Sequence, residues 1–414
     1  MSSTVPVAIV GGGIGGLALA LELNAAGIEC RVFESVAQLS AVGVGINLLP
    51  HATRHLDRLG LLPELTSAAV STRESVFFNR FGQLIHTEPT GLNAGYRWPQ
   101  FSVHRGDLQA ILAGAVRDRL GPDALVTGHT CVDAAEDATG VTLTFAHPDG
   151  TTTTHRATAV VGCDGIHSAI RKQLHPAEGA PVYSGYNMWR GVTVHEPILS
   201  GASMIRAGWL ATGKLVVYPI RDNVDAAGRQ LVNWVVEIET PQHADRDWNR
   251  TGRVEDFLDH FADWHFDWLD VPALMRDADS ILEYPMVDQD PLPWWGTDRI
   301  TLLGDAAHPM VPRGSNGGGQ AVLDAAALAE ALRTHSQIPA AFAAYEQLRR
   351  PATTAVVQAN RTNPPDAILR EVYERTGDRP FDDIGNVITE SELDRILAEY
   401  KRTAGYSLGA LNDA

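Results

Sequence analysis

The sequence has few of the features that mark secreted or metal-dependent proteins. Its 414 residues include only three cysteines, at Cys30, Cys131 and Cys163. Their odd number and wide spacing indicate neither a disulfide framework nor a structural zinc site. His51 and His55 lie four residues apart, but no acidic residue or cysteine with matching spacing accompanies them. We therefore expect no metal ion and a reducing, cytoplasmic environment.

Long hydrophobic runs and excess positive charge are also missing. The most apolar stretch, Val5 to Leu21, contains five glycines and is ended by Glu22 before it reaches the length of a membrane span. A signal peptide would have Lys or Arg before its apolar stretch, and none precedes this one. The chain has 33 basic and 50 acidic side chains, a formal net charge of −17, which disfavours nucleic acid and anionic membranes as partners. Small ligands are favoured instead.

The first 34 residues have the pattern of a strand, a helix and a second strand. A short apolar strand, Val7 to Val10, runs into Gly11-Gly12-Gly13-Ile14-Gly15-Gly16, and a small-residue helix then reaches Ala26. The second strand ends at Glu34, where an acid can accept a hydrogen bond from a ribose hydroxyl. The G-x-G-x-x-G spacing lets a pyrophosphate approach the start of the helix. The sequence predicts a dinucleotide site, but this motif alone does not distinguish FAD from NAD.

The rest of the chain alternates between apolar strands and helices and supports a second unit in the middle. A chain of this length favours two packed substructures. Residues 183–194, 214–220 and 231–238 are β-rich and aromatic, and we predict a separate sheet there. We expect an amphipathic helix at 254–261 and further helices at 108–116 and 321–332. Beyond Pro351 the pattern is mostly helical, without recognisable chemistry.

Two further motifs extend the dinucleotide signal. Cys163-Asp164-Gly165-Ile166-His167-Ser168 follows a buried strand, and Gly304-Asp305-Ala306-Ala307-His308-Pro309 follows another. Together with the glycine turn they resemble the three-part signature of the class A flavin hydroxylases, the family of p-hydroxybenzoate hydroxylase. The resemblance covers most of residues 1–360. Segments 44–52, 189–191 and 283–286 look most like the phenazine-carboxylate hydroxylases.

The resemblance implies an α/β fold in which a Rossmann-like FAD-binding domain is joined to a discontinuous β-sheet substrate domain and a C-terminal helical segment. We expect the FAD-binding domain at 1–75, 105–180 and 286–350, the substrate domain at 76–104 and 181–285, and the helical segment at 351–414.

The resemblance also implies a cofactor, a reaction and a set of site residues. A protein of this family binds FAD without a covalent bond, takes hydride from NADH or NADPH bound transiently, and hydroxylates an aromatic or N-heteroaromatic substrate with O2 through a flavin C4a-hydroperoxide. We expect a monomer or homodimer. No side chain is assigned as catalytic, and Pro312, Gly314, Asn316 and Gly317 are expected beside the flavin ring, with Asp305 on a ribityl hydroxyl. The expected cofactor-binding residues are Gly11, Gly13, Ile14, Gly15, Gly16, Glu34, Gly45, Arg105, Gln109, Asp164, Gly165, Gly304, Asp305, Pro312, Gly314, Asn316 and Gly317.

The middle sheet supplies candidates for the substrate pocket. They are Tyr186, Trp189, Arg190, Tyr218 and Trp234. Each aromatic side chain could instead pack in a core, and Arg190 could meet either a substrate carboxylate or a structural partner. A flavin oxidase or dehydrogenase of the same fold, or a non-catalytic FAD-binding protein, is the alternative.

Overall fold

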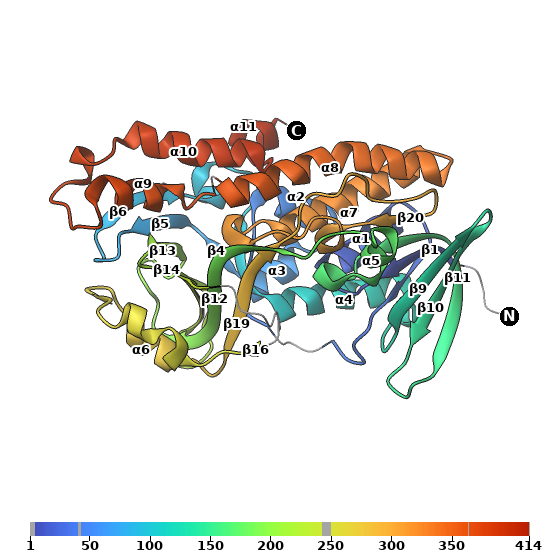
Figure 1. Cartoon of the computed structure of the whole chain (residues 1–414), viewed down its shortest axis with the longest axis horizontal. Helices are drawn as coiled ribbons and strands as arrows, with labels where there is room; N and C mark the ends of the chain where they lie inside the picture. The colour runs from blue at the N-terminus through green and yellow to red at the C-terminus, as the bar shows by residue number, and fades with distance from the viewer. Residues whose placement is uncertain (1–4, 40–42, 242–249, 363, 414) are drawn as a thin grey trace.

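Figure 1 shows the computed structural model, which describes residues 5–39, 43–241, 250–362 and 364–413. Two large sheets organise the fold. In the first, the strands run in the order β8-β2-β1-β11-β10-β9, and β20 also pairs with β11. Its strands are β1 (Val5–Val10), β2 (Cys30–Phe33), β8 (Leu125–Val126), β9 (Thr130–Asp137), β10 (Gly140–Ala146), β11 (Thr152–Gly162) and β20 (Ile300–Leu302).

The parallel part of the first sheet brings the three sequence motifs together. β11 pairs in parallel with β1 on one side and with β20 on the other, so that Val10, Gly162 and Leu302 lie in register at the carboxyl edge. The glycine turn, the Asp164-Gly165 turn and the Gly304-Asp305 turn leave this edge together. Because ligands of open α/β sheets bind beyond the carboxyl ends of the strands, this edge is where a site is expected.

Helices cover this sheet and supply most of its core. α1 (Ile14–Ala25) packs against both α4 (Arg105–Leu120) and α7 (Gly317–Thr334), and α7 packs against α8 (Ile338–Thr362). Eight successive residues of α1, from Gly16 to Leu23, are buried, as expected for a helix that is apolar on all sides. The predicted β-α-β opening and the alanine-rich helix are confirmed. No helix of the described residues is long and apolar enough to cross a membrane.

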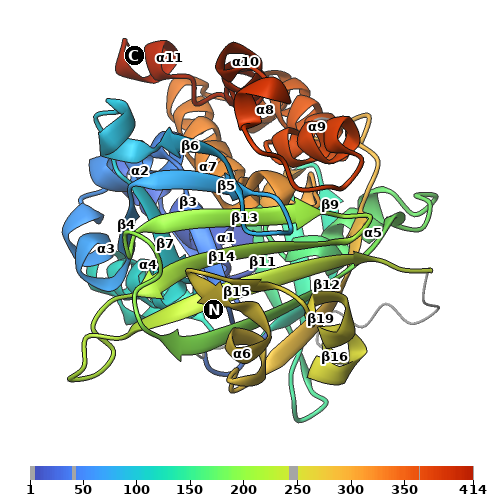
Figure 2. The same cartoon turned by 90° about the vertical axis from the view of Figure 1, so that its left-hand side faces the viewer.

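The second sheet is mostly antiparallel, in the order β16-β19-β12-β15-β14-β13-β5-β6 (Figure 2). The separate sheet predicted for the middle of the chain is therefore confirmed. A smaller sheet of β3 (Gly45–Leu48), β7 (Gln100–His104) and β4 (Val70–Thr72) lies beside α2 (Pro50–Arg58), and α3 (Leu62–Ala68) follows α2 in the chain. The strands of the large sheet are β5 (Glu74–Phe78), β6 (Leu84–Pro89), β12 (Val182–His195), β13 (Ser203–Trp209), β14 (Gly213–Arg221), β15 (Gln230–Glu239), β16 (Arg250–Thr251) and β19 (Ile281–Asp288).

One face of this sheet is covered by short elements where we expected one helix. Residues 254–261 form two 3-10 helices, η4 (Val254–Asp256) and η5 (Leu258–Phe261), followed by α6 (Val271–Arg276). The expectation of a single helix was wrong. The backbone of Phe257 has φ −140°, which interrupts helical geometry between the two turns. Phe257 and Phe261 are nonetheless buried against the sheet.

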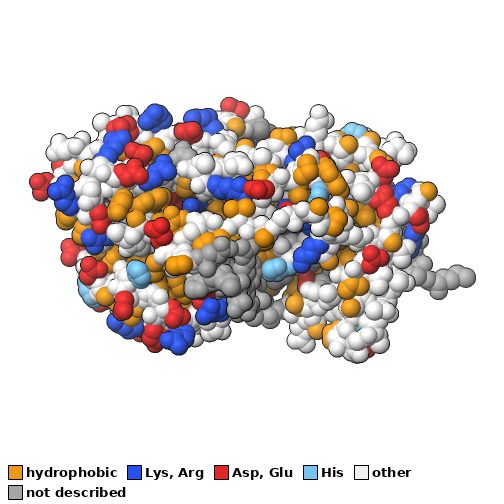
Figure 3. All heavy atoms as spheres, in the orientation of Figure 1, with side chains coloured by type: hydrophobic (Ala, Val, Ile, Leu, Met, Phe, Trp, Pro, Cys, Tyr) orange, Lys and Arg blue, Asp and Glu red, His pale blue; other side chains and the backbone are white. Residues whose placement is uncertain are grey.

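The C-terminal helices close the other side of the molecule (Figure 2). α8 continues through Pro351, so the boundary expected at 350/351 lies within a helix, just as the one expected at 285/286 lies within β19. Pro351 lacks an N–H, but burial of Tyr345 and Thr353 on either side holds the helix together. α9 (Ala367–Thr376), α10 (Glu390–Thr403) and α11 (Leu408–Asn412) follow, and α9 contacts β5 and β13. On the face shown in Figure 3, acidic and basic side chains are interspersed.

Candidate active site

A cavity of about 560 Å³ lies where the first sheet's turns meet the second sheet. Its lining includes the three motif turns, the start of β3 and the start of α7. Side chains from β12, β14 and β15 form the opposite wall. The volume is within the range of small-molecule sites.

The glycine turn presents one packed side and one open side. An added Cβ at Gly11, where φ is +109°, would lie 2.3 Å from the carbonyl oxygen of Cys163, and one at Gly16 would lie 2.0 Å from that of Gly11. A Cβ at Gly15 would meet Leu303 at 2.8 Å. Gly13, in contrast, has no atom within 4 Å of its added Cβ and lines the cavity. The turn is a cradle whose open side faces the cavity.

Two helices begin at this cavity without a capping side chain. The N-caps are Gly13 for α1 and Asn316 for α7, and among the described residues neither cap has a side chain that accepts a hydrogen bond from the first N–H groups of its helix. The first N–H groups of a helix have no partner inside it, and the helix dipole adds partial positive charge there. Such ends bind anions, in particular phosphate groups.

Glu34 and Gln109 hold the glycine turn from outside the cavity. The Glu34 carboxylate accepts hydrogen bonds from the backbone N–H of Gly12 at 2.6 Å and of Val36 at 2.9 Å. The Gln109 Nε2 donates to the carbonyl oxygen of Gly12 at 2.8 Å. Neither residue is part of the cavity lining, although both were expected to contact the cofactor. In the structure their contacts fix the backbone of the turn.

The Asp164-Gly165 turn lies on the cavity wall. Asp164 accepts hydrogen bonds from Ser168 Oγ at 2.5 Å and from the N–H of Ala169 at 2.8 Å, which caps α5 (Ala169–Leu174). Burial raises the pKa of Asp164, and these hydrogen bonds oppose the rise. Gly165 has φ +74°, a left-handed conformation that favours glycine.

Asp305 is the acid most open to the cavity. It belongs to η6 (Gly304–Ala306), and its side chain is exposed while its neighbours Gly304 and Ala306 are buried. Desolvation within the cavity raises the pKa of Asp305, and the interactions with His308 and Arg105 oppose this rise. Arg105, the first residue of α4, lines the same cavity. Asp305 can therefore accept hydrogen bonds from a ligand in the cavity.

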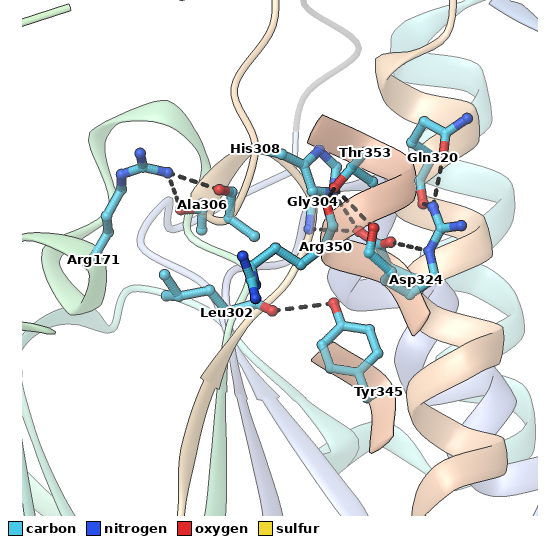
Figure 4. A network of polar contacts seen from close by, with 12 residues as sticks. Arg171, Leu302, Gly304, Ala306, His308, Gln320, Asp324, Tyr345, Arg350 and Thr353 are labelled. Atoms are coloured by element: carbon cyan, nitrogen blue, oxygen red, sulfur yellow. Dashed lines mark hydrogen bonds and ion pairs between the residues drawn. The ribbon is translucent and has the colours of Figure 1, made fainter. Parts of the chain in front are cut away.

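A buried network holds the Gly304-Asp305 turn in place (Figure 4). Asp324 of α7 accepts hydrogen bonds from Gly304 N at 3.1 Å, from His308 Nε2 at 2.5 Å and from Arg349 Nε at 2.7 Å. Although burial opposes it, His308 and Arg349 lower the pKa of Asp324 to about 2. Sequence reasoning missed Asp324. Asp324 is one of only two acids in this alanine-rich helix, and that was the available signal.

Arg171 supports the same turn from α5. Its Nη1 donates to the carbonyl oxygens of Ala306 and Ala307, both at 2.9 Å (Figure 4). Its other nitrogens pair with Glu178. The second and third motifs are therefore joined directly through this side chain.

The segment expected beside the flavin ring is only partly in the cavity. Pro312, Asn316 and Gly317 line it, but Gly314 does not. The side of Gly314 where a Cβ would project is filled by the hydroxyl of Tyr400 from α10, 1.5 Å from that position. Asn316 Oδ1 accepts a hydrogen bond from His51 Nε2 at 2.9 Å, while its Nδ2 has no partner in the described structure.

Of the five expected substrate-pocket residues, two line the cavity. Arg190 Nη2 and Tyr218 Oη both donate to the carbonyl oxygen of Gly45, at 2.6 and 3.1 Å. Tyr186 instead lines a neighbouring cavity of about 310 Å³. Trp189 and Trp234 are buried with Phe257 on the far face of the sheet, which corrects the expected set.

Strand geometry explains the correction. Side chains alternate between the two faces of a strand. Met188 and Arg190 face the cavity, so Trp189 between them faces away, and Trp234 precedes the cavity-facing Val235. Sequence reasoning missed the apolar residues of the cavity wall, which are Met188, Val216, Val235 and Met286.

These features fit FAD. Gly13 leaves space at an uncapped helix start, Asp305 offers a carboxylate inside the cavity, and the unpartnered Asn316 Nδ2 offers a donor. When bound, FAD accepts hydride from a nicotinamide and activates oxygen.

Comparisons with known proteins agree with the geometry. A family model described as FAD binding domain matches residues 4–360. Phenazine 1,6-dicarboxylic acid hydroxylase PhzS of Lysobacter antibioticus is 45% identical over 361 residues, covering 86% of this chain and 89% of its own. The 3-amino-4-hydroxybenzoate 2-monooxygenase PtnB3 of Streptomyces platensis is 35% identical and covers 86% of both chains. A salicylate hydroxylase substrate complex matches with a TM-score of 0.71 at 26% identity, covering 98% of this chain and 99% of that one.

The predicted family, fold class, FAD cofactor and enzyme class are therefore confirmed. NADH or NADPH is the reductant typical of these hydroxylases. The chain belongs to the FAD binding domain family and is an FAD-dependent aromatic monooxygenase, which acts on a small aromatic substrate with O2.

Proposed function

We propose that this monooxygenase hydroxylates a flat N-heteroaromatic carboxylic acid of the phenazine type. The observation that carries the proposal is an apolar wall with cations at both ends. In one row across the sheet, Val235 of β15 and Val216 of β14 lie between Arg190 of β12 and Arg206 of β13, and Met188 lies two residues from Arg190 along β12. Strands lie about 4.8 Å apart, so the two arginines are roughly 14 Å apart, far enough for fused rings to lie between them. The 45% identical relative is named for a phenazine dicarboxylic acid.

We propose roles for the cofactor-binding residues from their positions. Gly13, Ile14 and Gly15 would hold the pyrophosphate at the start of α1, and Asp305 would accept a hydrogen bond from a ribityl hydroxyl. Glu34 and Gln109 would act by shaping the glycine turn. Gly45, Arg105, Asp164, Gly165, Gly304, Pro312, Asn316 and Gly317 would line the rest of the cofactor site. The apolar wall would keep water from the reacting carbon.

We also propose an organisation and a setting. The FAD-binding domain would comprise the first sheet and its helices, and the substrate domain the eight-stranded sheet, near the boundaries expected from sequence. The net charge of −17 supports the proposal that the protein does not bind nucleic acid. Three free cysteines support a cytoplasmic location, with the protein acting as a monomer or homodimer.

The test is a turnover panel with the FAD-loaded enzyme. NADH and NADPH oxidation would be followed with phenazine carboxylic acids, quinoline carboxylic acids and single-ring hydroxybenzoates, under ¹⁸O₂. We expect fused N-heteroaromatic acids to give the highest kcat/KM and a product that carries one ¹⁸O atom. If single-ring acids are hydroxylated and fused acids only produce hydrogen peroxide, the proposed substrate class is wrong.

A further inference from the structure

The wall of the cavity contains a row of five buried charged side chains. The row runs from Arg206 through Asp366, Lys214 and Glu237 to Arg313. Each is at most 9% exposed, and each lines the cavity. Since a charge taken out of water loses its hydration, each member of such a row needs a partner of opposite charge.

The first four charges neutralise one another. Asp366 Oδ1 lies 3.1 Å from Arg206 Nε, and its Oδ2 contacts Lys214 Nζ. Lys214 Nζ also donates to Glu237 Oε1 at 3.0 Å. Arg206 has a further acceptor in Ser75 Oγ at 3.2 Å. Two cations and two anions are thus paired.

Arg313 is the fifth charge, and Glu237 neutralises it only in part, because Lys214 shares the same carboxylate. The nearest carboxylate oxygen, Glu237 Oε2, is 3.6 Å from Arg313 Nε, too long for a hydrogen bond. Neither Nε nor Nη2 of Arg313 has a hydrogen-bond partner among the described residues. The guanidinium lies 4.9 Å from the ring centroid of Tyr186. Three cations against two anions leave one positive charge in the wall.

The two unpartnered nitrogens of Arg313 define the ligand that would fit. Nε and Nη2 form one side edge of the guanidinium, and such an edge binds a carboxylate through two parallel N–H···O bonds. A carboxylate carries the one negative charge that the row lacks. A neutral amide would leave that charge uncompensated.

Arg313 also lies between two cavities. It belongs to η7 (Pro312–Gly314) and lines both the active-site cavity and the neighbouring cavity. In the neighbouring cavity, Asp288 is already paired with Arg361 at 2.8 Å, and Arg370 adds another cation. An anion that enters through this second cavity meets net positive charge up to Arg313.

We infer that Arg313 binds the carboxylate of the aromatic substrate, and that the Arg206–Asp366–Lys214–Glu237 row holds it in place. The inference rests on the proposed substrate class and adds the residue that recognises the acid. Arg313 is a specificity residue because it distinguishes an acid from its amide, whatever the ring.

Equilibrium binding to the oxidised, FAD-loaded enzyme tests this without turnover. Phenazine-1-carboxylic acid and phenazine-1-carboxamide would be titrated while the flavin absorption spectrum is recorded. We expect the wild type to prefer the acid roughly 10- to 100-fold, as a charge-assisted pair of hydrogen bonds implies. Arg313→Gln should weaken acid binding by that factor and leave amide binding nearly unchanged. Arg313→Lys should be intermediate, since an ammonium lacks the two-nitrogen edge.

The control is Arg253→Gln, which removes a positive charge from a side chain that is 70% exposed. It should bind both ligands as the wild type does. An Arg313→Gln enzyme that retains both FAD and the wild-type preference for the acid would overturn the inference about Arg313 but not the proposed substrate class. If Arg313→Gln loses FAD, the test rests on Arg313→Lys. An Arg313→Lys enzyme with the wild-type ratio of acid to amide affinity would then overturn the inference. If no aromatic acid binds the wild type, the proposed substrate class fails and the inference fails with it.

Discussion

His51 shows how a single buried side chain can link the site to pH. It lies in α2, is 2% exposed, and stacks on Tyr406 with ring centroids 5.4 Å apart. Its Nε2 bonds to Asn316 Oδ1, directly before α7 begins. Desolvation lowers the pKa of His51 to about 3. An unfolded histidine has a pKa of about 6.5, so the unfolded chain binds a proton here that the folded protein excludes.

We predict that His51 makes the protein less stable as the pH falls. Because its folded pKa is depressed, the stability associated with the neutral ring is complete above about pH 6.5 and declines below it, by up to about 1.4 kcal/mol per pH unit. His51→Gln, which can keep the donor to Asn316, should flatten the fall of the thermal midpoint between about pH 6.5 and pH 5. His55→Gln should flatten the same range to a similar extent, since burial lowers the pKa of His55 to about 4, which also lies below pH 5. An identical pH profile for His51→Gln and the wild type would count against this account.

The turns after β1, β11 and β20 are the elements on which the site depends. They meet because three parallel neighbouring strands end at one edge. Within the first turn, the glycines have different reasons to be glycine. Gly16 lies against the backbone of Gly11, whereas Gly13 faces only the cavity.

We therefore predict opposite defects from valine at these two positions. Gly13→Val should fold, with the thermal midpoint of the FAD-free protein unchanged, but it should retain little FAD because the side chain projects into the cavity. Gly16→Val should fail to fold properly, since even its Cβ would lie 2.0 Å from a backbone oxygen. Flavin absorbance after gel filtration and thermal melts of the FAD-free proteins separate the two effects. Full FAD occupancy in Gly13→Val would show that the phosphate lies elsewhere.

These turns could be predicted from the sequence because the residues that identify each of them are close together in the chain. The strand, glycine turn, helix and second strand occupy residues 5–34 in one run, and each motif follows its own strand. Which side chains of β12 and β15 point toward the cavity could not be predicted in the same way. Both faces of these strands are buried, so hydrophobicity does not show which side Trp189 or Met188 takes.

At the scale of the whole molecule, the C-terminal helices join the two sheets. Tyr96 Oη donates to the carbonyl oxygen of Tyr406 at 2.6 Å, and Gln320 of α7 donates to that of Ala404 at 3.1 Å. Lys401 of α10 pairs with Glu88 of β6 at 2.6 Å. The residues of this segment predict helices but contain no recognisable motif. Its partners lie far away in the chain, and no local pattern encodes them.

The last prediction concerns the contact between α10 and the loop that contains Arg313. Tyr400 Oη donates to Asn360 Oδ1 at 2.8 Å and occupies the position of a Cβ at Gly314. Gly314→Ala should therefore push α10 and the loop apart, at a cost of about 1–3 kcal/mol, and should weaken the binding of aromatic acids as Arg313 moves. Tyr400→Leu in the same chain should restore part of both losses by making room. Gly114→Ala in α4, where an added Cβ meets nothing within 4 Å, is the control and should be neutral or slightly stabilising. Thermal midpoints and titrations with an aromatic acid would be measured for the wild type, Gly314→Ala, Gly314→Ala/Tyr400→Leu and Gly114→Ala. If Tyr400→Leu restores neither the stability nor the acid binding lost in Gly314→Ala, α10 and the loop are not coupled.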